Sequence, residues 1–361
     1  MRQPTLVFFS LVACASPPAA DSKAPADSDA VTDTGDTGDT AELIDTAGIP
    51  WVEEPCDVPT PNFMDLYVHA SADGIAWEPP LFVRGLASVP EVLVDSRIDG
   101  GTPWMLWMDF EDRSDRCDQL VFSPINPATG EATDVRKTHI RDAPELTLLT
   151  HGYPHPVSDP DITVVGNRIV LMNTIWPVGQ PYACAGIAVA MDEGTMGAGV
   201  FAYQPHLLWC DPDHLEALTD PLGVWVPDDR SDPDSAGVIR VWASSSLGMI
   251  GGYIDNMEWI VAVPDPNDPS TWTTQELRSS PLTEFHALGS VQYVGNTDCM
   301  YAMWGTKDPW VHRGCTSDFE TWSEVATPDP FSADPVVAEA DGAWYMYVTR
   351  DLLYTGEPRP E

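Results

Sequence analysis

The chain has 361 residues, 43% of them hydrophobic, so it is long enough to bury a sizeable core. Asp and Glu number 56 against 17 Lys and Arg, which gives a formal net charge of -39. We expect no nucleic-acid partner, because such partners require basic side chains to neutralise phosphates. The acidity is expected mainly to keep the surface soluble.

The first segment predicts export. Arg2 precedes a brief apolar stretch that is too short to span a bilayer as a helix, and Leu11-Val12-Ala13-Cys14 ends it. These four residues resemble the lipobox of bacterial lipoproteins, in which the cysteine is acylated. We predict that residues 1–14 are a lipoprotein-type signal, that Cys14 is lipidated, and that the protein lies in the bacterial cell envelope, at the outer membrane or cell surface. An ordinary secretory signal cut near Ala13 or Ala15 is the alternative.

Residues 15–50 differ in composition from the rest of the chain. They are rich in Ala, Pro, Ser, Asp and Thr and include the tandem repeat Asp33–Thr40. Because this segment has few apolar residues to bury, we predict a disordered linker that holds the folded part off the membrane.

Residues 51–361 show β-strand patterns, with short alternating apolar runs between Gly, Pro, Asn and Asp. Five times, an extended segment leads to a Trp- or Tyr-rich run, roughly 45–70 residues apart. The five extended segments are Val89–Val92, Asp159–Ile162, Asp220–Leu222, Gly289–Tyr293 and Asp334–Val337. This spacing suits one four-stranded blade per repeat and predicts an all-β, five-bladed β-propeller.

A second motif places a Ser/Asp turn before a Trp. Ser71–Trp77 and Ser317–Trp322 carry it, and Asp268–Trp272 is a looser copy. The Asp can accept hydrogen bonds from its own turn while the Trp packs on the hairpin. The pattern resembles the outer-hairpin signature of propellers that handle sugars.

Together the Asp-Pro strand starts and these hairpins resemble the arabinanase, levansucrase and invertase superfamily, particularly glycoside hydrolase family 43. The resemblance implies an inverting glycosidase with an aspartate base at an Asp-Pro strand start, a tuning aspartate and a glutamate acid. It points to Asp159 as the base, Asp220 as the tuning residue and Glu284 as the acid, with Glu91 as the alternative acid.

The same resemblance implies a carbohydrate ligand in an axial pocket, with His155, His286 and Asp334 as candidate binding residues. It implies no cofactor, although calcium on the axis stays open, and we expect a monomer. Two alternatives remain. Each Asp-Pro could serve only to cap a turn and start a strand, and the propeller could bind glycan or protein without catalysis.

Six cysteines remain after Cys14, an even number that is typical of an oxidising compartment. Fifteen pairings are possible in principle. Proximity in the sequence favours Cys56–Cys117, Cys184–Cys210 and Cys299–Cys315. No Cys or His spacing indicates zinc, so we predict structural disulfides.

Overall fold

The computed structural model describes part of the chain, all of it within one compact unit, Ala47–Glu361. The described residues are 64–109, 119–142, 158–175, 177, 183–210, 217–232, 234–245, 256–279, 285–294, 296–304, 310–330 and 332–351. The predicted signal, linker and lipidation site Cys14 lie outside them. No helix in the described part of the chain is long and apolar enough to cross a bilayer.

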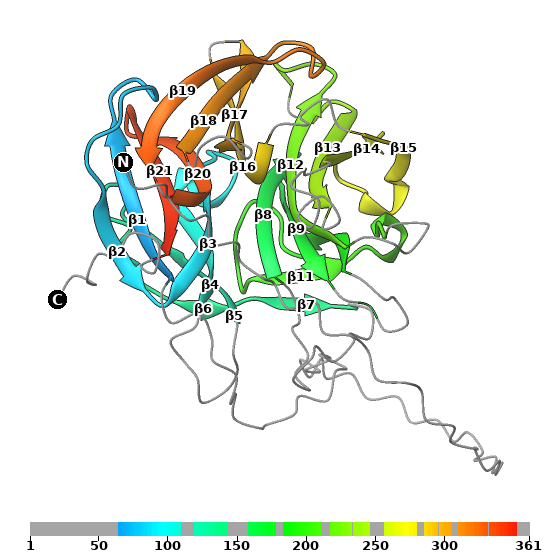
Figure 1. The fold of residues 1–361 in the computed structure, drawn as a ribbon. Coiled ribbons are helices and arrows are strands. Elements are labelled where there is room, and N and C mark those ends of the chain that lie inside the picture. The colour runs from blue at the N-terminus through cyan, green and yellow to red at the C-terminus, as the bar shows by residue number, and fades with distance from the viewer. Residues whose placement is uncertain are drawn as a thin grey trace, which may run out of the picture. The chain divides into compact units, whose positions relative to one another are not determined.

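Five sheets, built mainly from antiparallel strands, surround a central axis (Figure 1). The innermost strands contact one another in a ring: β3 (Ala87–Leu93), β8 (Ser158–Val165), β12 (Leu218–Pro227), β16 (Phe285–Val294) and β20 (Ser332–Ala340). These strands contain the five extended segments of the sequence repeat. The prediction of a five-bladed β-propeller is therefore confirmed.

Blades 1 and 2 follow each other along the chain. Blade 1 continues outward from β3 through β4 (Trp104–Asp109), β5 (Gln119–Pro124) and β6 (Arg136–Lys137). Blade 2 continues from β8 through β9 (Arg168–Ile175), β10 (Cys184–Ala190) and β11 (Val200–Tyr203), and β7 (His139–Arg141) adds a parallel fifth strand to β11.

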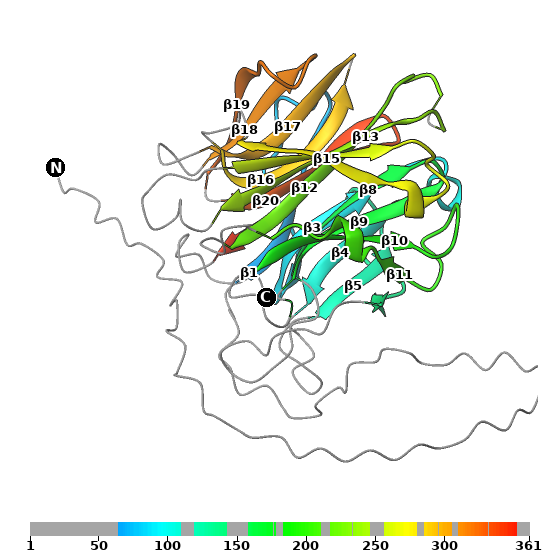
Figure 2. The ribbon, with the colours of Figure 1, turned by 90° about the vertical axis from the view of Figure 1, so that its right-hand side faces the viewer.

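Blades 3 and 4 repeat the four-stranded pattern. Blade 3 continues from β12 through β13 (Gly237–Ser245), β14 (Asn256–Val263) and β15 (Thr273–Ser279), and Figure 2 looks onto β15 from outside. Blade 4 continues from β16 through β17 (Thr297–Trp304), β18 (Trp310–Thr316) and β19 (Ser323–Pro330). Three short 3₁₀ turns complete the described elements: η1 (Asp99–Gly101), η2 (Pro205–Leu207) and η3 (Pro269–Thr271).

Blade 5 closes the ring with strands from both parts of the chain. Its inner strands β20 and β21 (Ala343–Asp351) come last in the sequence, whereas β1 (Met64–Ser71) and β2 (Leu81–Gly85) come first. Strands β1 and β21 pair over eight residues, from Met64 with Asp351 to Ser71 with Trp344. This pairing ties the two ends of the propeller together.

The apolar runs have a simple cause, because each blade is buried on both faces. In β4, Trp104, Leu106 and Met108 pack toward blade 2, whereas the alternating Met105 and Trp107 pack toward blade 5. Five clusters of buried apolar side chains fill the five spaces between neighbouring blades of the described residues. The aromatic side chains of the repeat therefore serve mainly as core.

The Ser/Asp turns have the predicted hydrogen bonds. Asp73 Oδ1 accepts from the N–H groups of Ile75 and Ala76, each at 2.9 Å. Asp318 Oδ1 accepts equivalently from Glu320 and Thr321, and Thr316, rather than Ser317, takes the place of Ser71. In the looser copy, Asp268 accepts from the N–H of Ser270 at 3.2 Å.

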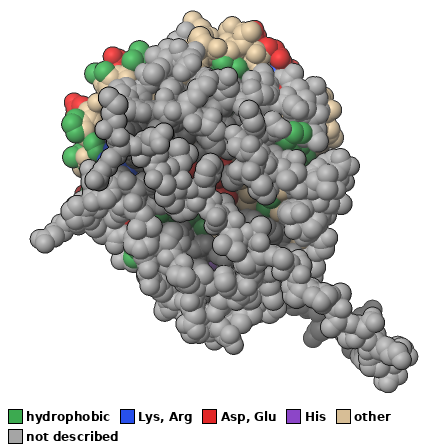
Figure 3. All heavy atoms as spheres, viewed as in Figure 1, with side chains coloured by type: hydrophobic (Ala, Val, Ile, Leu, Met, Phe, Trp, Pro, Cys, Tyr) green, Lys and Arg blue, Asp and Glu red, His purple; other side chains and the backbone are tan. Residues whose placement is uncertain are grey.

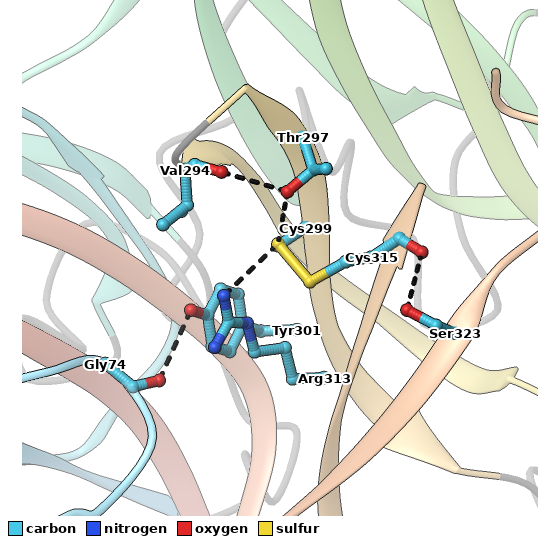
Figure 4. Close-up of a disulfide and its surroundings, with 8 residues drawn as sticks. All are labelled: Gly74, Val294, Thr297, Cys299, Tyr301, Arg313, Cys315 and Ser323. Atoms are coloured by element: carbon cyan, nitrogen blue, oxygen red, sulfur yellow. Dashed lines mark hydrogen bonds between the residues drawn. A yellow bond between two sulfur atoms is a disulfide. The ribbon is translucent and has the colours of Figure 1, made fainter. Parts of the chain in front are cut away.

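Two predicted disulfides are present. Cys184 pairs with Cys210 within blade 2 and its exit loop, and Cys299 pairs with Cys315 across β17 and β18. Around the second disulfide, Arg313 donates to Cys299 Sγ at 3.4 Å (Figure 4). In the same region the Tyr301 hydroxyl donates to the carbonyl of Gly74 in blade 5 at 3.4 Å. The predicted Cys56–Cys117 pair lies outside the described residues.

Candidate functional site

Four inner strands begin with the same strained bulge. The pairing register shifts between Ser88 and Glu91, Ser158 and Asp161, Thr219 and Leu222, and Ala333 and Val336. Inside each bulge one residue has a left-handed backbone and precedes a proline: Val89 (φ 46), Asp159 (φ 48), Asp220 (φ 52) and Asp334 (φ 48). Such φ values are uncommon outside glycine, and strain of this kind concentrates at functional sites.

The remaining inner strand, β16, has a glycine at its bulge. The register of β16 shifts between Ala287 and Ser290. A Cβ on Gly289 would lie 1.9 Å from the carbonyl oxygen of Tyr301 and 2.5 Å from that of Pro335. The backbones of blades 4 and 5 approach too closely here for any side chain.

Buried hydroxyl groups hold two of the bulges in place from the preceding blade. The N–H of Asp220 donates to Thr174 Oγ1 at 3.1 Å, and the N–H of Val89 donates to Thr349 Oγ1 at 2.9 Å. Thr174 and Thr349 occupy equivalent places on the second strands β9 and β21, paired with Ser158 and Ala333. The residues of the bulges are thus positioned by the blade next to them.

The bulges line a small pocket on the axis that opens to solvent. It is lined by Val89, Glu91, Asp159, Pro160, Asp161, Asp220, Pro221, Leu222, Gly289 and Asp334. Every inner strand contributes to it. Figure 3, which views the molecule as Figure 1 does, shows acidic side chains near the centre of that face.

Three half-buried carboxyl groups at the bulges influence one another. Burial raises the pKa of Asp220 well above its usual range, and the charges of Asp159 and Asp334 raise it further. Burial and the charge of Asp159 raise the pKa of Asp334 to about 7, although a hydrogen bond from Thr349 acts against this. An ionised Asp159 therefore favours the protonated forms of its two neighbours.

A second carboxyl pair lies two residues further along the strands. Burial raises the pKa of Glu91 well above its usual range, and the adjacent charge of Asp161 raises it further. Burial also raises the pKa of Asp161, but the N–H of Gly223 donates to Asp161 Oδ2 at 2.7 Å and the Glu91 carboxyl donates a hydrogen bond to it. These donors stabilise the ionised form of Asp161, so we place the shared proton on Glu91.

This second pair also joins three blades. Glu91, Asp161 and Ser290 are each the first residue after their bulge. Ser290 Oγ accepts from the N–H of Val337 in the next blade at 2.9 Å, as Asp161 accepts from Gly223. Asp161 thus has a structural role between blades that its position after Asp159-Pro160 does not reveal by itself.

The structure brings together three of the predicted site residues: Asp159, Asp220 and Asp334 all line the pocket. Glu91, the alternative acid, lines it too. His286 belongs to strand β16, whereas Glu284 and His155 lie outside the described residues.

The described pocket residues do not form a cation site. Among them, no group of three or more His, Cys, Asp or Glu side chains is arranged to hold a metal ion. Asp161 is engaged by the Gly223 N–H and by Glu91.

No family model matches the chain, and the curated proteins include no match. Solved structures similar to it include an exo-β-1,3-galactanase from Phanerochaete chrysosporium, with 12% identity over 77% of this chain and a TM-score of 0.44. This chain spans 63% of that galactanase chain, less than two thirds of its length. A family 43 β-xylosidase/α-arabinofuranosidase from a compost metagenome has 12% identity, a TM-score of 0.49, and coverage of 75% of this chain and 88% of its own.

A family 43 endo-arabinanase from Bacillus licheniformis is also similar, with 12% identity, a TM-score of 0.40, and coverage of 70% of this chain and 85% of its own.

Proposed function

We propose that the axial pocket binds a carbohydrate and hydrolyses its glycosidic bond. The observation that carries this proposal is the convergence of Asp159, Asp220 and Asp334 on one pocket from three identically strained bulges. Because one ionised carboxylate raises the pKa of its neighbours, the pocket can hold a base and protonated groups together near neutral pH.

In the proposed reaction, Asp159 is the general base. It takes a proton from a water molecule as the water attacks the anomeric carbon, while an acid protonates the departing oxygen. Asp220 tunes the charge of the pocket, and Asp334 accepts hydrogen bonds from sugar hydroxyl groups. Glu284 is the proposed acid, with Glu91 as the alternative, because Glu91 lines the pocket and carries a proton.

A panel of aryl glycosides tests the proposal. We expect turnover of at least one neutral glycoside by the wild type, and a loss of about 100-fold or more in Asp159→Asn, since base catalysis contributes about 10²–10⁴-fold. Asp341→Asn is a matched control, because Asp341 also has a left-handed backbone but lies in the exposed turn between β20 and β21.

Turnover by Asp159→Asn at the wild-type rate would contradict the assignment of the base. Binding of a glycan by the wild type without any turnover would instead favour the non-catalytic alternative. Calorimetry with the same sugars distinguishes these outcomes, because it detects binding whether or not a bond is broken.

We also propose that the protein is exported and anchored in the bacterial envelope through Cys14, on the evidence of its lipobox-like sequence. Acyl chains contribute about 0.8 kcal/mol per buried methylene group, so several chains on one cysteine give stable attachment. Cys14→Ser is expected to move the protein from the membrane fraction to the soluble fraction. Unchanged membrane association of this variant would overturn the proposed acylation.

A further inference from the structure

Val89 is the exception among the four strained bulges. Its φ of 46° and the proline after it match Asp159, Asp220 and Asp334. Its N–H donates to Thr349 in the way that the N–H of Asp220 donates to Thr174. Blade 1 therefore presents a valine where three other blades present a carboxyl group.

Valine is a poor residue for this backbone. A left-handed φ is most unfavourable for β-branched side chains, whereas Asp tolerates it better because its short polar side chain can hydrogen-bond locally. A following proline restricts the conformation further. The local backbone alone would favour Asp, so the valine side chain itself must have a role.

The surroundings of Val89 indicate that role. The residue is half-buried: part of its side chain packs against the apolar cluster between blades 1 and 2, and it also lines the pocket. Pro160, Pro221 and Leu222 are the other apolar side chains of the pocket. The bulge residue of blade 1 is thus apolar, whereas the bulges of blades 2, 3 and 5 carry carboxyl groups, and Glu91 of blade 1 lines the pocket two residues further along β3.

We infer that Val89 is a specificity-determining residue that packs against a C–H surface of a neutral sugar unit, while the bulge carboxyl groups bind its hydroxyl groups. This inference rests on the proposed function and adds the orientation and chemical class of the ligand. A sugar ring has both kinds of surface, so it matches a pocket in which carboxyl groups and apolar side chains lie side by side. An anionic sugar is disfavoured, because its charge would lie among carboxylates.

Three variants test the inference. Val89→Thr retains the branched shape and changes one methyl group to a hydroxyl. Val89→Asp introduces the residue that the same bulge already holds in three blades, so we expect it to fold. Val226→Thr is the matched control, because Val226 is a half-buried valine of β12 that packs between blades 3 and 4 and is not part of the pocket lining.

Binding is measured with the glycoside of the panel that binds the wild type most tightly. It is also measured with analogues of this glycoside, each of which lacks one hydroxyl group. We expect Val89→Thr to weaken binding about tenfold or more, the usual effect of changing a single group in an apolar pocket. The loss should appear in Kd or KM rather than in kcat. The wild type should prefer the analogue that presents C–H groups to blade 1. Val89→Thr should lose this preference. Val89→Asp should bind more weakly still, and Val226→Thr should bind like the wild type.

Wild-type affinity and wild-type discrimination in both Val89 variants would overturn the inference and leave the proposed function intact. A wild-type protein that binds no sugar of the panel would overturn the proposed function, and this inference with it. Thermal unfolding of every variant identifies those that fold, and Val89→Asp decides the question if Val89→Thr does not.

Discussion

At the scale of single residues, the pocket combines carboxyl groups that favour opposite protonation states. Asp159 raises the pKa of Asp220 and Asp334, while Glu91 holds the proton that it shares with Asp161. Burial is the largest cause of each increase, because it penalises the charged form. An arrangement of this kind makes the protein less stable than it would be with neutral side chains at the same places.

Asp334 gives a measurable consequence of this arrangement. Its pKa of about 7 in the folded protein exceeds the usual value of an aspartate, so the folded state binds the proton more tightly than the unfolded state. The resulting stabilisation is complete below about pH 4 and is lost as the pH rises through 7. Asp334→Asn should therefore raise the free energy of unfolding by about 1–3 kcal/mol at pH 8, allowing for screening in the open pocket, with little change near pH 4.

Asp318→Asn is a control of opposite sign. Backbone hydrogen bonds from Thr321 and Glu320 lower the pKa of Asp318 to about 2. This group stabilises the folded state above the usual pKa of an aspartate, and its contribution is lost as the pH falls toward 2. Asp318→Asn should therefore lower stability at neutral pH. Denaturant unfolding across the pH range measures both effects. If the two substitutions changed the free energy of unfolding at neutral pH in the same direction, the assigned pKa shifts would be contradicted.

At the scale of elements, the bulges depend on the close approach of neighbouring inner strands. Gly289→Ala tests this approach, because its Cβ would meet the backbone oxygens of Tyr301 and Pro335. Backbone atoms cannot rotate away, so we expect a loss at the upper end of the usual 1–3 kcal/mol for overpacking, about 3 kcal/mol.

Gly342→Ala separates this steric effect from backbone strain. Gly342 has a φ of +77° and no neighbouring atom within 4 Å of an added Cβ. Its substitution should reduce the free energy of unfolding by about 1–2 kcal/mol, through the left-handed backbone alone. If thermal unfolding shows that Gly289→Ala loses no more stability than Gly342→Ala, the close packing of Gly289 against the backbones of Tyr301 and Pro335 is contradicted.

At the scale of the whole molecule, the sequence predicts what the five repeats share. The inner strand pair of every blade was predictable, because its apolar runs recur and are buried on both faces. The closure of blade 5 was not, since β1 and β21 are far apart in the sequence and carry no local signal for pairing. The parallel addition of β7 to blade 2 has the same explanation.

The candidate site was predictable only in part. Asp159, Asp220 and Asp334 stood out because their Asp-Pro start recurs. The pairing of Glu91 with Asp161 depends on the register of two separate hairpins, in which each is the first residue after the bulge. The repeats align Glu91 with Asp161 and Val89 with Asp159, and Glu91 was predicted as the alternative acid, but the contact between the two carboxyl groups appears only in the folded structure.

Hydrolysis in the axial pocket with Asp159 as base is tested most directly by proton NMR of the first product formed from the best glycoside. We expect the wild type to release a sugar of inverted anomeric configuration, because a base-activated water attacks the face opposite the departing oxygen. We expect Asp159→Asn to give no such signal on the same timescale. Product of retained configuration, or equal product from the wild type and Asp159→Asn, would contradict this mechanism.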